Sequence, residues 1–198
     1  MQEILFPLLL HHGIFFLTEN RRAQYHMAMY ILQNNIKKHS ELPKVAPIVH
    51  SLPTLPEGYV NLSFFHNWIV GFTCAEGSFL KDTTTPARSI PLTTCTTPPH
   101  RINDGCFQLS QNMHIKLFES FKLVFRTSRK IMINHNHSRF SVSSKRDIQN
   151  VINFFSFSGN HPLVGVKNIQ YLIWLDKLRN SSRYKKLNFP PRLATAGK

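Results

Sequence analysis

The chain has 198 residues, of which 42% are hydrophobic, so it is long and apolar enough to form a core and is not a disordered tail. Its 24 Lys and Arg residues outnumber its 10 Asp and Glu residues, and almost all of the excess lies in residues 101–198. This uneven charge favours a polyanionic partner such as a nucleic acid, while three cysteines without metal-ligand spacing argue against a disulfide framework or a zinc site.

The first segment, residues 1–38, has the pattern of a helical hairpin. Its apolar run, Ile4–Leu17, is interrupted by Pro7 and Gly13. The run is too short and too broken to cross a bilayer, and it lacks the positive flank and cleavage site of a signal peptide. We therefore expect it to be buried structure.

This hairpin is similar to a second segment that lies 146 residues further along the chain. Glu3–Asn34 aligns with Gln149–Asn180 without gaps, and both segments predict an apolar helix, a glycine-bearing turn and a second helix. We interpret residues 1–38 as the end of a first repeat whose beginning is absent from the sequence. The matched positions are Gly13 and Gly159, Leu17 and Leu163, Arg21 and Lys167, Gln24-Tyr25 and Gln170-Tyr171, Leu32 and Leu178, and Asn34 and Asn180.

Two irregular stretches follow. Residues 39–66 are predicted to be a linker, because Pro43, Pro47, Pro53 and Pro56 break helices and Glu57-Gly58 offers a turn. Residues 82–104 are rich in Thr and Pro, and they predict a long loop between two strands.

Between these stretches, Asn67–Phe79 predicts a short apolar helix that ends at an acid followed by glycine. Gly71 and Ala75 lie four residues apart on one helix face, where small side chains let a second helix approach closely. Glu76 would lie at the negative end of the helix dipole, which is unfavourable for a carboxylate unless a cation binds there. The motif therefore predicts a helix-pair interface and a cation site.

Three segments alternate polar and apolar residues, as strands with one solvated face do. They are Ser78–Lys81, Phe107–Gln111 and Arg139–Ser143. Any one of them could be a merely solvated surface, but three in one basic region favour contact with DNA, where Arg can read guanine and Gln adenine. The candidate DNA-binding residues are Ser78, Lys81, Gln108, Ser110, Arg139, Ser141 and Ser143.

The remaining basic residues are expected to contact phosphates rather than bases. Phe118, Phe121, Val124 and Phe125 have helical spacing and are expected in the core. The candidate phosphate contacts beside them are Lys116, Lys122, Arg126, Arg129 and Lys130, and the segment Arg183–Lys186 is basic as well.

Ile69–Gly77, followed by Ser78-Phe79, resembles the namesake motif of the LAGLIDADG homing endonucleases of the kind encoded in organellar group I introns. The motif departs from the common form at Cys74, where an acid is usual, but that position is not the metal ligand. The resemblance covers about residues 64–190. It extends in the expected order to Gly105–Gln111, Leu117–Glu119, Val142–Ile148 and Asn153–Gly165.

The resemblance implies an α+β half-domain, αββαββα, with an antiparallel saddle-shaped sheet and helices on one face. On this interpretation residues 1–38 are the helical tail of an incomplete first repeat, and residues 39–66 are the linker. Residues 67–190 are the endonuclease domain, and residues 191–198 are a basic tail.

The same resemblance implies a catalytic site. Glu76 would be the ligand of a divalent metal, Mg²⁺, and Gln111 would position water. Lys145 or Arg146 would stabilise charge on the phosphate, and the sequence leaves open which of the two does so. Gly71 and Ala75 would form the interface with a second motif helix.

The implied function is site-specific hydrolysis of double-stranded DNA, with residence in the mitochondrion and no membrane partner. Because two motif helices are needed, the second would come from a homodimer or from a missing N-terminal half, and the partial first repeat favours the missing half. The alternatives are an intron RNA maturase, that is, an RNA-binding splicing cofactor, an inactive remnant, and an inert basic domain.

Overall fold

A computed structural model of the chain describes residues 8–9, 11–44, 52–81, 105–112 and 114–192. The chain forms two compact units, Met1–Tyr59 and Val60–Lys198. The division falls inside the segment expected to be a linker. Among the described helices, none has the length and hydropathy that a membrane crossing requires. The Thr- and Pro-rich stretch 82–104 and most of the expected tail lie outside the described residues.

The first unit contains helix α2 (Glu19–Gln33) and a short 3-10 helix, η1 (His39–Glu41), and α3 (Pro56–Val60) begins at its end. Within the segment expected to be a linker, Pro56, Glu57 and Gly58 make up the first turn of α3, so the turn expected at Glu57-Gly58 is helical. Proline suits the first position of a helix, where its missing N–H would have no partner and its fixed φ is already helical.

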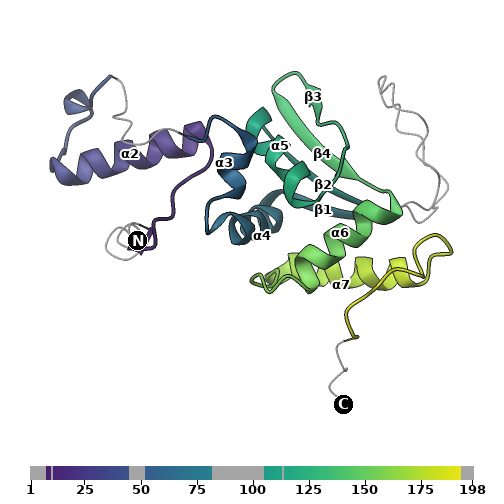
Figure 1. Cartoon of the computed structure of the whole chain (residues 1–198). Coiled ribbons are helices and arrows are strands. Elements are labelled where there is room, and N and C mark those ends of the chain that lie inside the picture. The colour runs from purple at the N-terminus through teal and green to yellow at the C-terminus, as the bar shows by residue number, and fades with distance from the viewer. Residues whose placement is uncertain (1–7, 10, 45–51, 82–104, 113, 193–198) are drawn as a thin grey trace, which may run out of the picture. The chain divides into compact units, whose positions relative to one another are not determined.

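The second unit has the order αββαββα expected from the sequence, followed by one further helix (Figure 1). The motif helix begins two residues before the predicted start and runs directly into the first strand. The elements are α4 (Phe65–Glu76), β1 (Gly77–Lys81), β2 (Gly105–Asn112), α5 (Ile115–Val124), β3 (Met132–Asn134), β4 (His137–Val142), α6 (Lys145–Ser156) and α7 (Gly165–Arg179).

The four strands form one antiparallel sheet in the order β1-β2-β4-β3. Because side chains alternate along a strand, the register divides each strand into two sets of residues. Phe107 and Leu109 of β2 are buried, as are their partners Val142 and Phe140 on β4. One face of the sheet is therefore the wall of the core.

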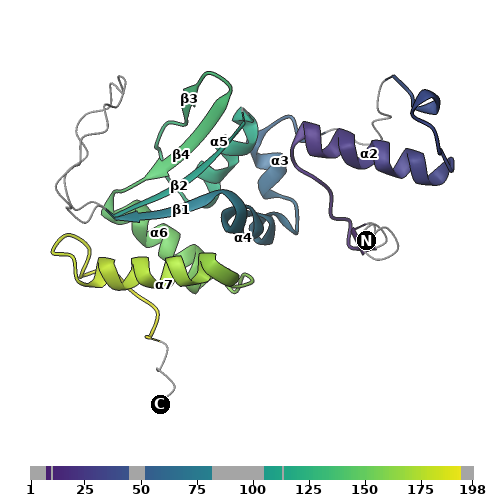
Figure 2. The ribbon, with the colours of Figure 1, turned by 180° about the vertical axis from the view of Figure 1, so that it is seen from behind.

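The helices cover this one apolar face. Phe121 of α5 lies against Phe140, Phe155 of α6 lies against Phe107, and Trp174 of α7 contacts Phe79. In Figures 1 and 2, which are turned by 180° relative to each other, α6 and α7 lie below the strands in both views. The prediction of helices on one side of an antiparallel sheet is confirmed, and none of the described helices of the second unit packs on the other side of the sheet.

Candidate functional site

The helix that carries the motif ends at Glu76, and β1 starts at the next residue. The Gly77 N–H caps the helix by donating to the Thr73 carbonyl oxygen. A Cβ on Gly77 would lie 2.5 Å from Thr73 Cγ2 and 2.6 Å from the Thr73 oxygen. Because its φ of −78° is an ordinary value, glycine is needed here for space. This tight junction fixes the exposed Glu76 carboxylate at the edge of the sheet.

One side of α4 packs into the core and the other is open. Phe65, Ile69, Val70 and Thr73 are buried. On the opposite side Gly71 and Ala75 are exposed, and a Cβ on Gly71 would meet no atom within 4 Å. A stripe of small residues therefore leads along α4 to Glu76, open to the approach of another helix.

Lys167 brings a positive charge to the same junction. It lies in the first turn of α7, and its Nζ donates to the carbonyl oxygen of Gly77 over 2.6 Å. The ammonium group is thus held one residue from Glu76. Lys167 is not among the site residues predicted from the sequence, although the internal repeat pairs it with Arg21.

Gln111 lies toward the same end of the sheet. Gly77 pairs with Leu109, and Gln111 stands two residues further along β2, opposite Ser138. Its Oε1 accepts from the backbone N–H of Asn112 over 3.1 Å. The structure therefore places Gln111 beyond the start of β1, where Glu76 also lies.

Lys145 and Arg146 lie at the other end, which corrects the expectation that one of them joins Glu76. They are the first two residues of α6. The preceding strand, β4, ends at Val142, which pairs with Phe107 of β2. The Tyr184 hydroxyl donates to the carbonyl oxygens of both Ser143 and Gly105, so the residues just before α6 lie near Gly105. Gly105 pairs with Lys81, four strand steps from Gly77, or about 13 Å.

The uncovered face of the sheet collects the polar residues of three strands. Ser78, Gln108 and Ser141 form one row across β1, β2 and β4. Ser110 pairs with Arg139 in the neighbouring row, so five of the seven candidate DNA-binding residues share this face. We call this set, Ser78, Gln108, Ser110, Arg139 and Ser141, the polar sheet face.

The other two candidates take different positions. Lys81 is the last residue of β1, where it pairs with Gly105, and its side chain lies outside the described part of the structure. Ser143 follows the last residue of β4, and its carbonyl oxygen accepts from Tyr184. Leu80 and Cys106 pair with each other and lie on the same side of the sheet as the polar sheet face. The Cys106 Sγ lies 3.2 Å from Ser141 Oγ.

Comparison with known proteins identifies this arrangement. No protein-family model matches the chain. Among solved structures, it is similar to I-SmaMI bound to an uncleaved DNA target in the presence of calcium ions. The TM-score is 0.58 and the identity 18%, covering 90% of this chain and 65% of that one. The chain has the LAGLIDADG homing endonuclease fold.

Two further solved structures are similar to the chain. The LAGLIDADG meganuclease I-CpaMI bound to uncleaved DNA gives a TM-score of 0.57 at 18% identity, covering 93% of this chain and 68% of that one. The LAGLIDADG homing endonuclease I-GzeII in complex with its DNA target is 22% identical over 58% of this chain and 35% of its own, with a TM-score of 0.43. The chain thus spans 35% of I-GzeII and 65% of I-SmaMI.

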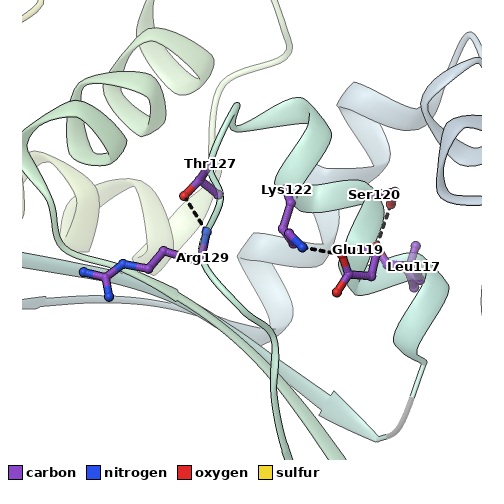
Figure 3. Close-up of polar contacts among 6 residues, drawn as sticks. All are labelled: Leu117, Glu119, Ser120, Lys122, Thr127 and Arg129. Carbon is purple, nitrogen blue, oxygen red and sulfur yellow. Dashed lines mark hydrogen bonds and ion pairs between the residues drawn. The ribbon is translucent and has the colours of Figure 1, made fainter. Parts of the chain in front are cut away.

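The electrostatics of the LAGLIDADG half-domain favour an anion on the uncovered face. None of the four strands contains an Asp or Glu residue. On α5, Lys122 is ion-paired with Glu119 over 2.6 Å, which leaves it less charge to offer a phosphate. Figure 3 shows the Arg129 guanidinium pointing away from this pair, while the Arg129 backbone N–H donates to Thr127 Oγ1 over 3.2 Å.

Proposed function

We propose that this chain is part of a LAGLIDADG homing endonuclease that cleaves double-stranded DNA at a specific site. The observation that carries the proposal is the junction of α4 and β1. There the open helix delivers Glu76 to the sheet edge, and Lys167 is bonded to the next residue, Gly77. An acid and a cation beside an acid-free, polar sheet face suit the binding and hydrolysis of a phosphodiester.

The polar sheet face would bind in the major groove. An antiparallel ribbon of two strands fits that groove, and its outward side chains can reach base edges. Arg139 is exposed and could pair with guanine, and Gln108 could pair with adenine. The solved structures similar to this chain include I-SmaMI and I-CpaMI bound to DNA, which supports double-stranded DNA as the partner.

Glu76 would hold the divalent cation, for which Mg²⁺ is the natural candidate. Among the described residues no three His, Cys, Asp or Glu side chains gather into an all-protein metal cage. Mg²⁺ does not need one, because it keeps several waters and binds through one or two carboxylates together with substrate phosphates. A single exposed carboxylate therefore fits Mg²⁺, and I-SmaMI bound its DNA target in the presence of calcium, a divalent ion of the same charge.

Each group would have one task. When bound, the cation would polarise a phosphate oxygen and lower the pKa of a water molecule. Gln111, with a half-buried side chain at this end of β2, would orient that water. The Lys167 ammonium would stabilise negative charge that builds on the phosphate during the displacement.

Cleavage of both strands would require a second motif helix against the stripe of Gly71 and Ala75. Residues 1–38 would be the end of a first repeat, and the other half of the enzyme would supply the second helix. A homodimer is the alternative source. Light scattering on the purified chain separates the two sources, because only a homodimer gives twice the mass of the chain.

Substitution of the acid tests the proposal. We expect Glu76→Gln to lower cleavage of the uninterrupted host gene sequence in Mg²⁺ by at least about 100-fold, because the amide is a poor metal ligand. Binding to the same duplex should be retained. Glu57→Gln, an exposed acid on α3, is the matched control and should leave cleavage unchanged.

Three outcomes would contradict the proposal. Equal cleavage by the wild-type chain and Glu76→Gln would remove Glu76 from the chemistry. Tighter binding to the folded intron RNA than to the duplex would favour the maturase function. Binding of the duplex without cleavage, also after a motif-bearing partner half has been added, would identify an inactive remnant.

A further inference from the structure

Two segments far apart in the sequence are joined at the end of the sheet opposite Glu76. The fully buried Tyr184 directs its hydroxyl to the carbonyl oxygens of Ser143, at 2.7 Å, and of Gly105, at 3.3 Å. The Gln149 side chain bonds both backbone groups of Asn188, donating to its oxygen over 3.0 Å and accepting from its N–H over 2.7 Å. The start of α6 is thereby fixed to residues 184–188.

Four exposed cations project from these joined segments. Lys145 and Arg146 occupy the first turn of α6, and Lys185 and Lys186 follow Tyr184. We call these four residues the distal basic cluster. Because hydrogen bonds join the two segments, the four charges are held on one part of the surface, where they can act on the same polyanion.

The described acid closest in sequence does not neutralise this cluster. Asp147 is 7% exposed, and its carboxylate accepts from the Ser144 hydroxyl over 2.7 Å while the Asp147 N–H donates back to that hydroxyl. Its carboxylate is thus engaged in capping α6. In the described part of the chain, no carboxylate forms an ion pair with any of the four cations. Their positive charge remains available to a partner.

The cluster lies in a defined place relative to the candidate active site. Ser143 is joined through Tyr184 to Gly105, and Gly105 pairs with the last residue of β1, whereas Glu76 precedes the first. The length of β1, about 13 Å, separates the two ends. Duplex DNA rises about 3.4 Å for each base pair, so this separation corresponds to about four base pairs.

We propose that the distal basic cluster binds the phosphate backbone of duplex DNA, about four or more base pairs outward from the phosphate nearest Glu76. The inference rests on the proposed function, because it places the cluster at the outer end of the DNA that the polar sheet face reads. Contacts of Lys and Arg with phosphates fix the register of a protein on DNA without reading sequence. The cluster thereby determines which phosphate of the duplex lies next to Glu76.

The test compares the DNA affinity of two double variants, one that lacks two lysines of the cluster and one that lacks two lysines elsewhere. Lys185→Ala/Lys186→Ala removes two charges from the cluster, and Lys37→Ala/Lys38→Ala removes two charges from exposed lysines of the first unit. Both are made in Glu76→Gln, so that DNA is bound without being cut. The probe is a duplex recovered by repeated selection from a randomised library, and its affinity is measured at several salt concentrations.

We expect the cluster variant to bind about 10-fold more weakly and the control variant to bind unchanged. Loss of two phosphate contacts should lower the slope of log affinity against log salt by about 1.8, at about 0.9 for each contact. Lys185→Arg/Lys186→Arg should keep the wild-type slope. The loss should also vanish on a duplex from which the outermost base pairs have been removed, because those phosphates are then absent for both proteins.

Each other result has a definite meaning. Equal losses for the two alanine pairs, or a loss that persists on the shortened duplex, would overturn the distal contact while leaving DNA binding intact. A loss confined to folded RNA would overturn it in favour of an RNA partner. If the parent protein binds no duplex in the selection, the proposed function itself fails. A second pair, Lys145→Ala/Arg146→Ala, guards against misfolding at residues 185 and 186 and should give the same two readouts.

Discussion

The second helices of the two similar segments, α2 and α7, have the same length and similar ends but lie in different environments. Helices α2 and α7 each contain 15 residues, and both ends of α7 lie 146 residues after those of α2. The preceding turns place Gly13 at φ +60° and Gly159 at φ +72°. Both helices follow an extended N-cap residue and end at an asparagine, Asn34 or Asn180. The sequence repeat thus encodes the same local structure twice.

The two helices differ in how deeply their side chains are buried. Trp174, Leu175 and Leu178 of α7 are almost completely buried, and Trp174 contacts β1. In α2 the counterpart of Leu178 is Leu32, which is 39% exposed, whereas Leu178 is 0% exposed. Local geometry follows from the nearby sequence, but burial needs a partner surface. The comparison supports the proposal that α2 belongs to a repeat whose sheet lies outside the described residues.

The largest expected difference concerns the matched cations, Lys167 and Arg21. Lys167 donates to a strand carbonyl beside Glu76, whereas Arg21 donates to Gln24 of its own helix over 3.1 Å. We expect Lys167→Met to lower cleavage by about 100-fold or more, as for the loss of one transition-state donor. Arg21→Met, whose charge is exposed, should change cleavage by less than about threefold. Equal losses in single-turnover cleavage would mean that both hairpins serve the chemistry.

The matched leucines should differ in stability. Leu178→Ala opens a cavity in a closed core and should lower the free energy of unfolding by about 2–5 kcal/mol. Leu32→Ala removes a partly exposed side chain and should cost less than about 1 kcal/mol. Urea unfolding of the two variants measures the difference. A large loss for Leu32→Ala would show that α2 is already packed in the free protein.

The matched tyrosines should differ in their response to alkali. Burial raises the pKa of Tyr171 to about 12, partly offset by the hydrogen bond with Ser156 and the charge of Arg179. Burial also raises the pKa of Tyr25, which is less enclosed. Since the folded pKa of Tyr171 exceeds its unfolded value near 10, its contribution is complete below pH 10 and is lost as the pH rises toward 12.

Two pKa units correspond to about 2–3 kcal/mol. Tyr171→Phe should therefore flatten the fall in stability between pH 10 and pH 12 relative to the unaltered chain, and Tyr25→Phe should flatten it less. Chemical unfolding at several pH values in this window gives both slopes. Identical slopes for the two variants would show that the environments of the two rings are alike.

The smallest effect should be equal in the two hairpins. Gly13 and Gly159 both have positive φ, and a Cβ at either would meet no atom within 4 Å. Alanine at either position would cost only the strain of the left-handed conformation, about 1–2 kcal/mol. Thermal unfolding of Gly13→Ala and Gly159→Ala should therefore give similar losses. A loss of thermal stability in only one of the two variants would show that the two glycine turns are not equivalent.

The sequence predicted what depends on short-range periodicity. The small-residue helix ending at Glu76, the alternation in β2 and β4, and the two glycine turns all follow from neighbouring residues. The fold class was implied by the resemblance of these segments, in their order, to the LAGLIDADG homing endonucleases.

The remainder depends on how distant segments meet. Lys167 reaches Gly77 only because α7 returns to the start of β1, a contact across 90 positions of sequence. Lys145 and Arg146 are carried away from Glu76 by the direction of β4, which only the register reveals. A basic residue near an expected motif is therefore weak evidence of a shared site unless the strand order is known.

The attachment of α7 to β1 also bears on the solubility of the isolated chain. β1 is an outer strand of the sheet, and outer strands are templates on which further strands can add and aggregates can grow. Two of its carbonyl oxygens, those of Gly77 and Leu80, already accept hydrogen bonds from Lys167 and Trp174. An incoming strand that paired with either carbonyl would have to displace the side chain bonded to it, and the opposite border, β3, offers only three residues. Both borders of the sheet thus offer less free backbone for the addition of another strand.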